Sequence, residues 1–186
     1  MDRIAADVLD DNFKTTLSGS SKDFVESSSS LMFAFVLALI FIYLVLSAQF
    51  ESFRDPLIIM FTVPLALIGA MVSLWYFDQT MNIFSQIGVI MLIGLVSKNG
   101  ILIVEFANQR KAMGEPMLIA VKNAAVARFR PILMTSLSTV LGILPMAIAT
   151  GAGAESRVAM GIAAVGGMVC ATFLSLFVIP AIYSYL

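Results

Sequence analysis

The chain has 186 residues, of which 60% are hydrophobic and 12% charged, and its net charge is −1 at pH 7. Soluble domains average about 45–50% apolar and about 25% charged residues, so 11 basic and 12 acidic side chains are too few to cover a water-exposed surface. The absence of histidine and the single cysteine exclude a histidine-ligated metal site, Ser–His or Cys–His catalysis and an internal disulfide. A net charge close to zero gives no sign of the basic surface that binds nucleic acid. We therefore expect an all-α membrane protein that is not an enzyme and holds no metal or cofactor.

Residues 1–30 differ from the rest because they are polar and carry nine of the charged side chains. They lack the basic start and apolar core of a secretory signal. We expect them to be the small aqueous end of an extramembrane domain and the lead-in to the first span. Within them, residues 14–18 are compatible with a short strand, and residues 20–26 with the start of a helix that continues into the membrane.

Five apolar segments follow and make residues 31–186 a transmembrane domain. At a rise of 1.5 Å per residue each can cross about 30 Å of hydrocarbon, and backbone groups in lipid must be satisfied within the segment, so each is predicted to be a helix. The predicted spans are approximately residues 31–50, 57–77, 83–107, 132–150 and 158–182.

The connection between the third and fourth segments is long. Its residues 115–128 are predicted to form a short amphipathic helix at the membrane surface, with Pro116 in the first turn. A plain connecting helix fits equally well. The apolar face consists of Met117, Ala120, Val121, Ala124 and Ala127.

Positive charge predicts the orientation. The first and the long connections carry most of the basic residues, whereas the loops on the opposite side carry Arg157 alone. Short cytoplasmic loops are rich in Lys and Arg, so the long connection and the C-terminus should be cytoplasmic and residues 1–30 outside. Since no signal explains how residues 1–30 crossed the membrane, we expect the chain to be the C-terminal part of a larger membrane protein.

Lys98 lies in the middle of the third segment. A charge at the bilayer centre costs at least about 2.5–3.5 kcal/mol and is usually functional or paired. Glu105 is on the same helix face but about 10 Å away along the axis, and no other acid lies deep in a span. The missing acid must come from outside this chain. We favour a proton- or ion-relay role for Lys98, and the alternative is a structural ion pair that joins two helices.

The fourth segment adds Arg128 and Thr135, which are seven residues apart and share a helix face. A threonine hydroxyl in a span can pass a proton, and Arg128 either takes part in this or anchors the helix at the membrane surface. Ser136 and Ser138 are expected to bond carbonyls of their own helix.

The last segment carries a small residue at every fourth position. Small side chains let helix backbones approach closely in lipid, so this stripe is predicted to be a packing face, with a sliding surface as a secondary interpretation. Its members include Ala159, Ala163, Gly167 and Ala171.

Three long ungapped stretches carry a family resemblance: GLVSKNGILIVEFANQ, RFRPILMTSLSTVLGILPMAIATGAG and YLVLSAQFESFRDPLIIMFTVPLALIGA. They resemble the C-terminal membrane half of resistance–nodulation–cell division (RND) efflux permeases, in the AcrB-type hydrophobe/amphiphile branch of Gram-negative bacteria. The resemblance covers approximately residues 17–186.

The resemblance implies proton/drug antiport in the bacterial inner membrane, with the N-terminus periplasmic. It implies that Lys98 faces two aspartates from the N-terminal half, and that Arg128 and Thr135 belong to the same relay. It also implies a homotrimer that works with a periplasmic adaptor and an outer-membrane channel. We expect this fragment alone to be inactive, because the aspartates are absent. An RND exporter of metals or lipids and a non-transporting helical remnant remain as alternatives.

Overall fold

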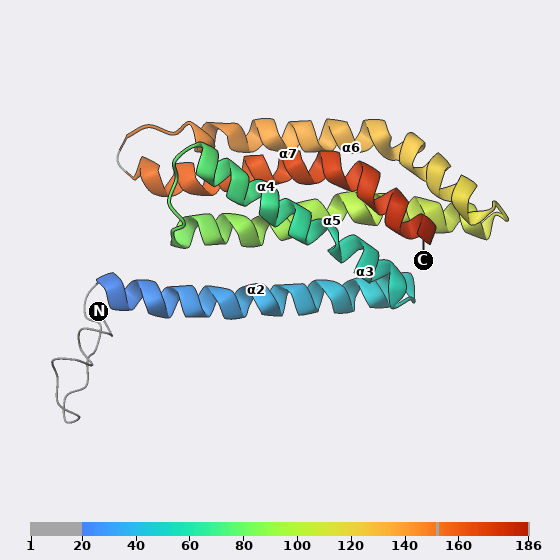
Figure 1. Ribbon diagram of the computed structural model, residues 1–186, viewed down its shortest axis with the longest axis horizontal. Coiled ribbons are helices and arrows are strands. Elements are labelled where there is room, and N and C mark those ends of the chain that lie inside the picture. Colours follow the sequence, from blue (N-terminus) through green and yellow to red (C-terminus); the bar gives the residue numbers. More distant parts are fainter. Residues whose placement is uncertain (1–19, 152, 186) are drawn as a thin grey trace, which may run out of the picture.

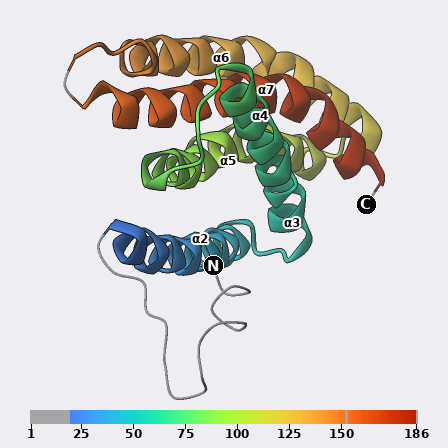
Figure 2. The ribbon, with the colours of Figure 1, turned by 60° about the vertical axis from the view of Figure 1, so that its left-hand side comes forward.

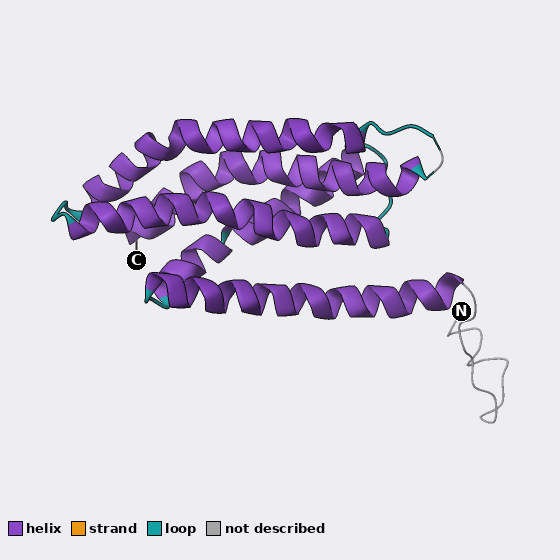
Figure 3. Ribbon diagram, turned by 180° about the vertical axis from the view of Figure 1, so that it is seen from behind, coloured by secondary structure: helices purple, strands orange, loops and turns teal. Residues whose placement is uncertain are grey.

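The computed structural model describes residues 20–151 and 153–185, which are helical between short turns and contain no strand (Figure 3). The expected all-α fold is confirmed, and the strand expected at residues 14–18 lies outside the described part. The helices are α2 (Ser20–Phe50), α3 (Arg54–Met60), α4 (Thr62–Tyr76), α5 (Ile83–Ala112), α6 (Met117–Ala147) and α7 (Ala154–Tyr185).

Five segments of this part of the chain are long and apolar enough to cross a membrane, with α3 and α4 together forming the second. Successive segments run in opposite directions, so the described N- and C-terminal ends lie at opposite ends of the bundle (Figure 1). The turns after α2 and α5 and the end of α7 lie together, and we call this the basic end. It carries Arg54, Arg110, Lys111, Lys122, Arg128 and Arg130.

α5 extends beyond the residue expected from the sequence, to Ala112. It begins with a capping box in which the Asn82 side chain accepts from the backbone N–H of Ser85 at 2.8 Å, and the Ser85 hydroxyl accepts from Asn82 at 2.8 Å. Two basic residues in its last turn complement the negative end of the helix dipole.

The turn from α5 to α6 is held by Glu115. Its carboxylate accepts a hydrogen bond from Arg110 at 2.7 Å and one from Asn123 at 3.1 Å. These bonds, with that from Arg110 the stronger, hold the pKa of Glu115 below its ordinary value. Gly114 has a φ of +91° there, which a residue with a Cβ rarely adopts.

α6 differs from the expectation of a separate surface helix followed by a span. Residues 117–147 form one continuous helix with Pro131 inside it. A proline removes one hydrogen-bond donor and crowds the carbonyl four residues earlier, which kinks a helix without necessarily ending it. Figure 1 shows the early yellow part of α6 turning away from the line of its orange part. The expected amphipathic segment is therefore the first part of a bent helix.

α7 is the centre of the bundle, because it packs against α4, α5 and α6. Its small-residue stripe is buried: Ala159, Ala163 and Ala171 are 0% exposed. A Cβ built on Gly167 would lie 2.1 Å from Leu92 Cδ2 of α5. The stripe thus forms close helix–helix contacts of the kind that small residues permit.

The contact between α4 and α7 is also made by glycines. A Cβ built on Gly69 would lie 2.3 Å from Cys170 Cβ, and one built on Gly166 would lie 2.2 Å from both Cβ and Oγ of Ser73. Ser73 also donates a hydrogen bond across the interface to the carbonyl of Ile162 at 3.1 Å.

α2 stands at the side of the bundle, and its backbone lies close to α3 and α5 but to no other described helix (Figure 2). Large apolar side chains along it are exposed, among them Phe33 at 71% and Phe41 at 58%. Such a surface suits lipid or further transmembrane helices rather than water.

Candidate functional site

Lys98 lies near the middle of α5 on a face that no described helix covers. Its side chain is exposed, whereas the neighbours Ser97 and Asn99 are buried at 4% and 1% exposure. Within residues 20–151 and 153–185, Lys98 has no hydrogen bond and no ion pair, and none joins it to Glu105. The Lys98 ammonium therefore faces away from the bundle, and no described residue is its acidic partner.

Arg128 of α6 lies two turns from Lys98 toward the basic end. Its guanidinium carbon is 4.8 Å from the ring centroid of Phe106 on α5, and Arg110 lies 5.3 Å from the same ring. Phe106 is eight residues after Lys98, about 12 Å along the helix axis. The Arg128 Nε is buried and has no acceptor among the described residues. An unsatisfied buried donor costs about 1–3 kcal/mol, so this nitrogen favours an acceptor from elsewhere.

Thr135 lies at the level of Lys98. It follows Arg128 by seven residues, about 10 Å along the axis, on a helix that runs antiparallel to α5. The next residue, Ser136, is hydrogen-bonded to Asn99, which fixes this register. The Thr135 hydroxyl donates to the carbonyl of Ile132 at 3.1 Å.

A buried polar cluster behind Lys98 was not predicted. The Asn99 side-chain amide donates to Ser136 Oγ at 3.3 Å and to Thr172 Oγ1 at 3.4 Å, and the two hydroxyls are hydrogen-bonded at 3.1 Å. Ser136 is 5% exposed and Thr172 is 3% exposed. The cluster joins α5, α6 and α7 at mid-span, on a buried face of α5 that is different from the exposed face of Lys98.

The expectation that Ser136 bonds a carbonyl of its own helix was wrong. Its partners are Asn99 on α5 and Thr172 on α7. The signal that could have identified the cluster was Asn99 itself, because an amide in the middle of an apolar span needs partners as much as a charge does. Which hydroxyls it would meet depended on helix register.

We expect the substitution Asn99→Leu to lower the temperature at which the helical bundle unfolds in detergent (its thermal unfolding midpoint). Leucine has similar size but removes both donors, and interhelical hydrogen bonds in membranes contribute about 0.6–2 kcal/mol each. Ser136→Ala should lower the midpoint by a smaller amount. Circular dichroism during heating would measure both.

Ser138→Ala is the matched control, because Ser138 is exposed on the same helix and has no hydrogen bond to a described side chain. Its midpoint should not change. An unchanged midpoint for Asn99→Leu, or equal losses for Ser136→Ala and Ser138→Ala, would contradict a stabilising role for the cluster.

Comparison with known proteins places these residues in a wider context. The sequence profile of the AcrB/AcrD/AcrF family matches residues 1–186. An uncharacterized transporter of Haemophilus influenzae is 44% identical over 188 residues, which cover 97% of this chain and 18% of that protein.

Two further relatives carry more informative names. The multidrug resistance protein MdtC of Erwinia amylovora is 39% identical over 172 residues, covering 92% of this chain and 17% of MdtC. The solvent-resistant pump membrane transporter SrpB of Pseudomonas putida is 39% identical over 166 residues, covering 89% of this chain and 16% of SrpB. The chain thus spans less than a fifth of the length of these relatives.

Proposed function

The chain belongs to the AcrB/AcrD/AcrF family of RND permeases, and on this premise we propose that it is the C-terminal membrane part of a proton-driven multidrug efflux transporter. The transporter would exchange protons for drug across the bacterial inner membrane. The names of MdtC and SrpB, a multidrug resistance protein and a solvent-resistant pump, favour apolar organic substrates over metals.

The observation that carries this proposal is the uncovered Lys98. An ammonium at mid-span that faces away from its own bundle requires carboxylates from further spans. The family resemblance supplies two aspartates on a span of the N-terminal half. Protonation of these aspartates would remove their attraction for Lys98, and the ammonium would then reorient.

Arg128 and Thr135 would extend the relay from Lys98 toward the basic end. Thr135 lies at the level of Lys98, and its hydroxyl can both accept and donate a hydrogen bond, as passage of a proton requires. Arg128, about 10 Å further on, has the buried Nε without a described acceptor. It would hold a water molecule or carboxylate of the relay and favour the ionised form of nearby acids.

The cluster around Asn99 would couple this relay to the rest of the bundle. Lys98 and Asn99 are adjacent, and their side chains leave α5 in different directions, one uncovered and one bonded to α6 and α7. A rotation or shift of α5 driven by Lys98 would therefore act directly on both helices.

The basic end is proposed to be cytoplasmic, because positive residues concentrate in short cytoplasmic loops. The N-terminus would then be periplasmic. The proposed partners are the remainder of the permease chain, two further copies in a homotrimer, a periplasmic adaptor and an outer-membrane channel, together with the lipid bilayer.

Reconstitution tests this function. The whole permease would be reconstituted in proteoliposomes that have an acidic lumen and contain a pH indicator. When drug is added outside, drug should enter the lumen and protons should leave it. The chain of residues 1–186 alone should show neither proton flux nor drug movement, because none of its described residues is an acid partner for Lys98.

Each outcome has a definite meaning. Proton or drug movement by residues 1–186 alone would contradict the requirement for the N-terminal half. Proton flux coupled to a metal ion or a lipid, with no response to drug, would favour the alternative substrate classes. A whole permease that moves neither protons nor solutes would support a non-transporting assembly.

A further inference from the structure

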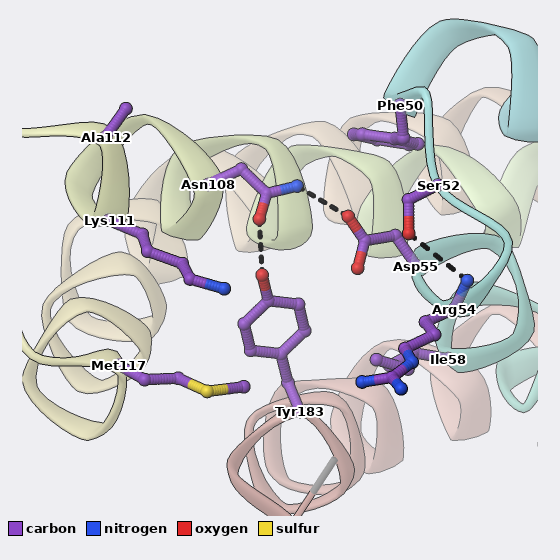
Figure 4. A pocket seen from close by; sticks show the side chains of 10 residues that line it. All are labelled: Phe50, Ser52, Arg54, Asp55, Ile58, Asn108, Lys111, Ala112, Met117 and Tyr183. Carbon is purple, nitrogen blue, oxygen red and sulfur yellow. Dashed lines mark hydrogen bonds between the residues drawn. The ribbon is translucent and has the colours of Figure 1, made fainter.

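A pocket of about 540 Å³ opens at the basic end, outside the site described above. It lies between the turn after α2, the start of α3 and the ends of α5 and α7, with the start of α6 at its rim (Figure 4). Its volume is within the range of small-ligand sites, about 300–1,000 Å³. Its lining combines charged, polar and apolar residues, among them Arg54, Asp55, Lys111, Phe50, Ile58 and Met117.

Asp55 lines this pocket, and one of its two carboxylate oxygens is hydrogen-bonded within the protein. Asn108 donates from its side-chain amide to Asp55 Oδ2 at 2.7 Å, and the Tyr183 hydroxyl donates to Asn108 Oδ1. No described residue bonds to the other oxygen of Asp55, which projects beside the pocket in Figure 4. The carboxylate is therefore oriented and keeps a free acceptor.

Two cations share the pocket without neutralising Asp55. The Lys111 ammonium points into it from α5, and the Arg54 guanidinium lies on the far side of Tyr183 (Figure 4). Neither forms an ion pair with a described carboxylate, although both lie in the same pocket as Asp55. The pocket thus presents separated positive and negative groups that a ligand of both charges would satisfy.

Location selects the class of ligand. The pocket is at the end of the spans, where lipid headgroups lie, and the apolar side chains of Phe50, Ile58 and Met117 can contact glycerol and the first acyl carbons. Basic pockets between transmembrane helices on the cytoplasmic side bind phosphate headgroups. A carboxylate in the same pocket favours a headgroup that also carries a primary ammonium.

We propose that this pocket binds the headgroup of phosphatidylethanolamine. The phosphodiester lies between Arg54 and Lys111, and the ammonium donates to the free oxygen of Asp55. Phosphatidylglycerol offers the phosphodiester but no ammonium, and the quaternary ammonium of phosphatidylcholine has no N–H to donate. The site shares no residue with the relay, so it does not depend on the proposed transport, although its place on the cytoplasmic side rests on the proposed orientation.

Lipid binding to the purified whole permease tests this proposal. After delipidation in detergent, phosphatidylethanolamine, phosphatidylglycerol and phosphatidylcholine with identical acyl chains would be titrated and the bound lipid counted by native mass spectrometry. Phosphatidylethanolamine should bind about tenfold more tightly than the other two, as expected for one additional charge-assisted hydrogen bond.

Variants separate the two halves of the headgroup. Asp55→Asn should abolish the preference for phosphatidylethanolamine while phosphatidylglycerol binding stays the same or increases, which also reports that the variant is folded. The double variant Arg54→Gln, Lys111→Gln should weaken binding of all three lipids. Arg130→Gln, an exposed basic residue at the same end but outside this pocket, should leave the lipid preference unchanged.

The proposal fails if the unaltered permease binds phosphatidylglycerol as tightly as phosphatidylethanolamine. It also fails if Asp55→Asn retains the preference, or if the double variant binds all three lipids normally. Transport activity does not enter any of these readouts, so their result is separate from that of the efflux assay.

Discussion

Lys98→Ala in the whole permease will reduce drug export to the level of cells without the transporter. The substitution removes the only charge that the described residues place at mid-span, and with it the group that the proposed aspartates attract. Growth on increasing drug concentrations and efflux of a fluorescent substrate would both measure the loss.

Lys122→Ala is the control, because it removes the same charge from an exposed position near the start of α6. It should export normally. The two interpretations of Lys98 separate on protein stability: a relay residue gives a folded, correctly assembled but inactive permease, whereas a structural ion pair gives an unstable one. Export that persists in Lys98→Ala would remove this residue from the mechanism.

Gly166→Ala will destabilise the bundle, although alanine is a better helix former than glycine. The new Cβ would lie 2.2 Å from both Cβ and Oγ of Ser73, so α4 and α7 must separate and weaken the bond from Ser73 to the carbonyl of Ile162. Overpacking of this kind costs about 1–3 kcal/mol. The measurement is the thermal unfolding midpoint in detergent.

Gly142→Ala is the matched control with the opposite sign. Gly142 is in α6, and nothing described lies within 4 Å of a Cβ built on it. The change should raise stability by up to about 1 kcal/mol through helix propensity alone. If both substitutions shift the midpoint in the same direction, the close approach of α4 and α7 is not the reason why position 166 requires glycine.

The transmembrane segments were predictable from the sequence because a backbone in lipid must form its hydrogen bonds within the segment, as a helix does. Hydropathy and length identified all five segments. The ends of the helices were harder to predict. α5, for example, continues to Ala112 through polar residues that suit a helix end in water. α6 shows the second limit, since the sequence predicted two helices, at 115–128 and 132–150, and the structure has one bent helix with Pro131 inside it.

The candidate site was predictable in part. An isolated charge such as Lys98 is visible in the sequence because a single residue in an apolar segment carries the signal. The cluster of Asn99 with Ser136 and Thr172 was not visible, because it depends on the relative height and rotation of three helices. The roles of Lys98, Arg128 and Thr135 remain predictions that the variants above address.

The bend in α6 also indicates how deep the helix sits. Pro131 has no N–H for the carbonyl of Ala127, and an unsatisfied carbonyl is tolerated where water or headgroups can reach it. Thr135, at the level of Lys98, lies four residues beyond Pro131, about 6 Å along the axis, so the proline lies within the span. Water that satisfies the carbonyl of Ala127 would therefore reach from the basic end to within about 12 Å of Thr135.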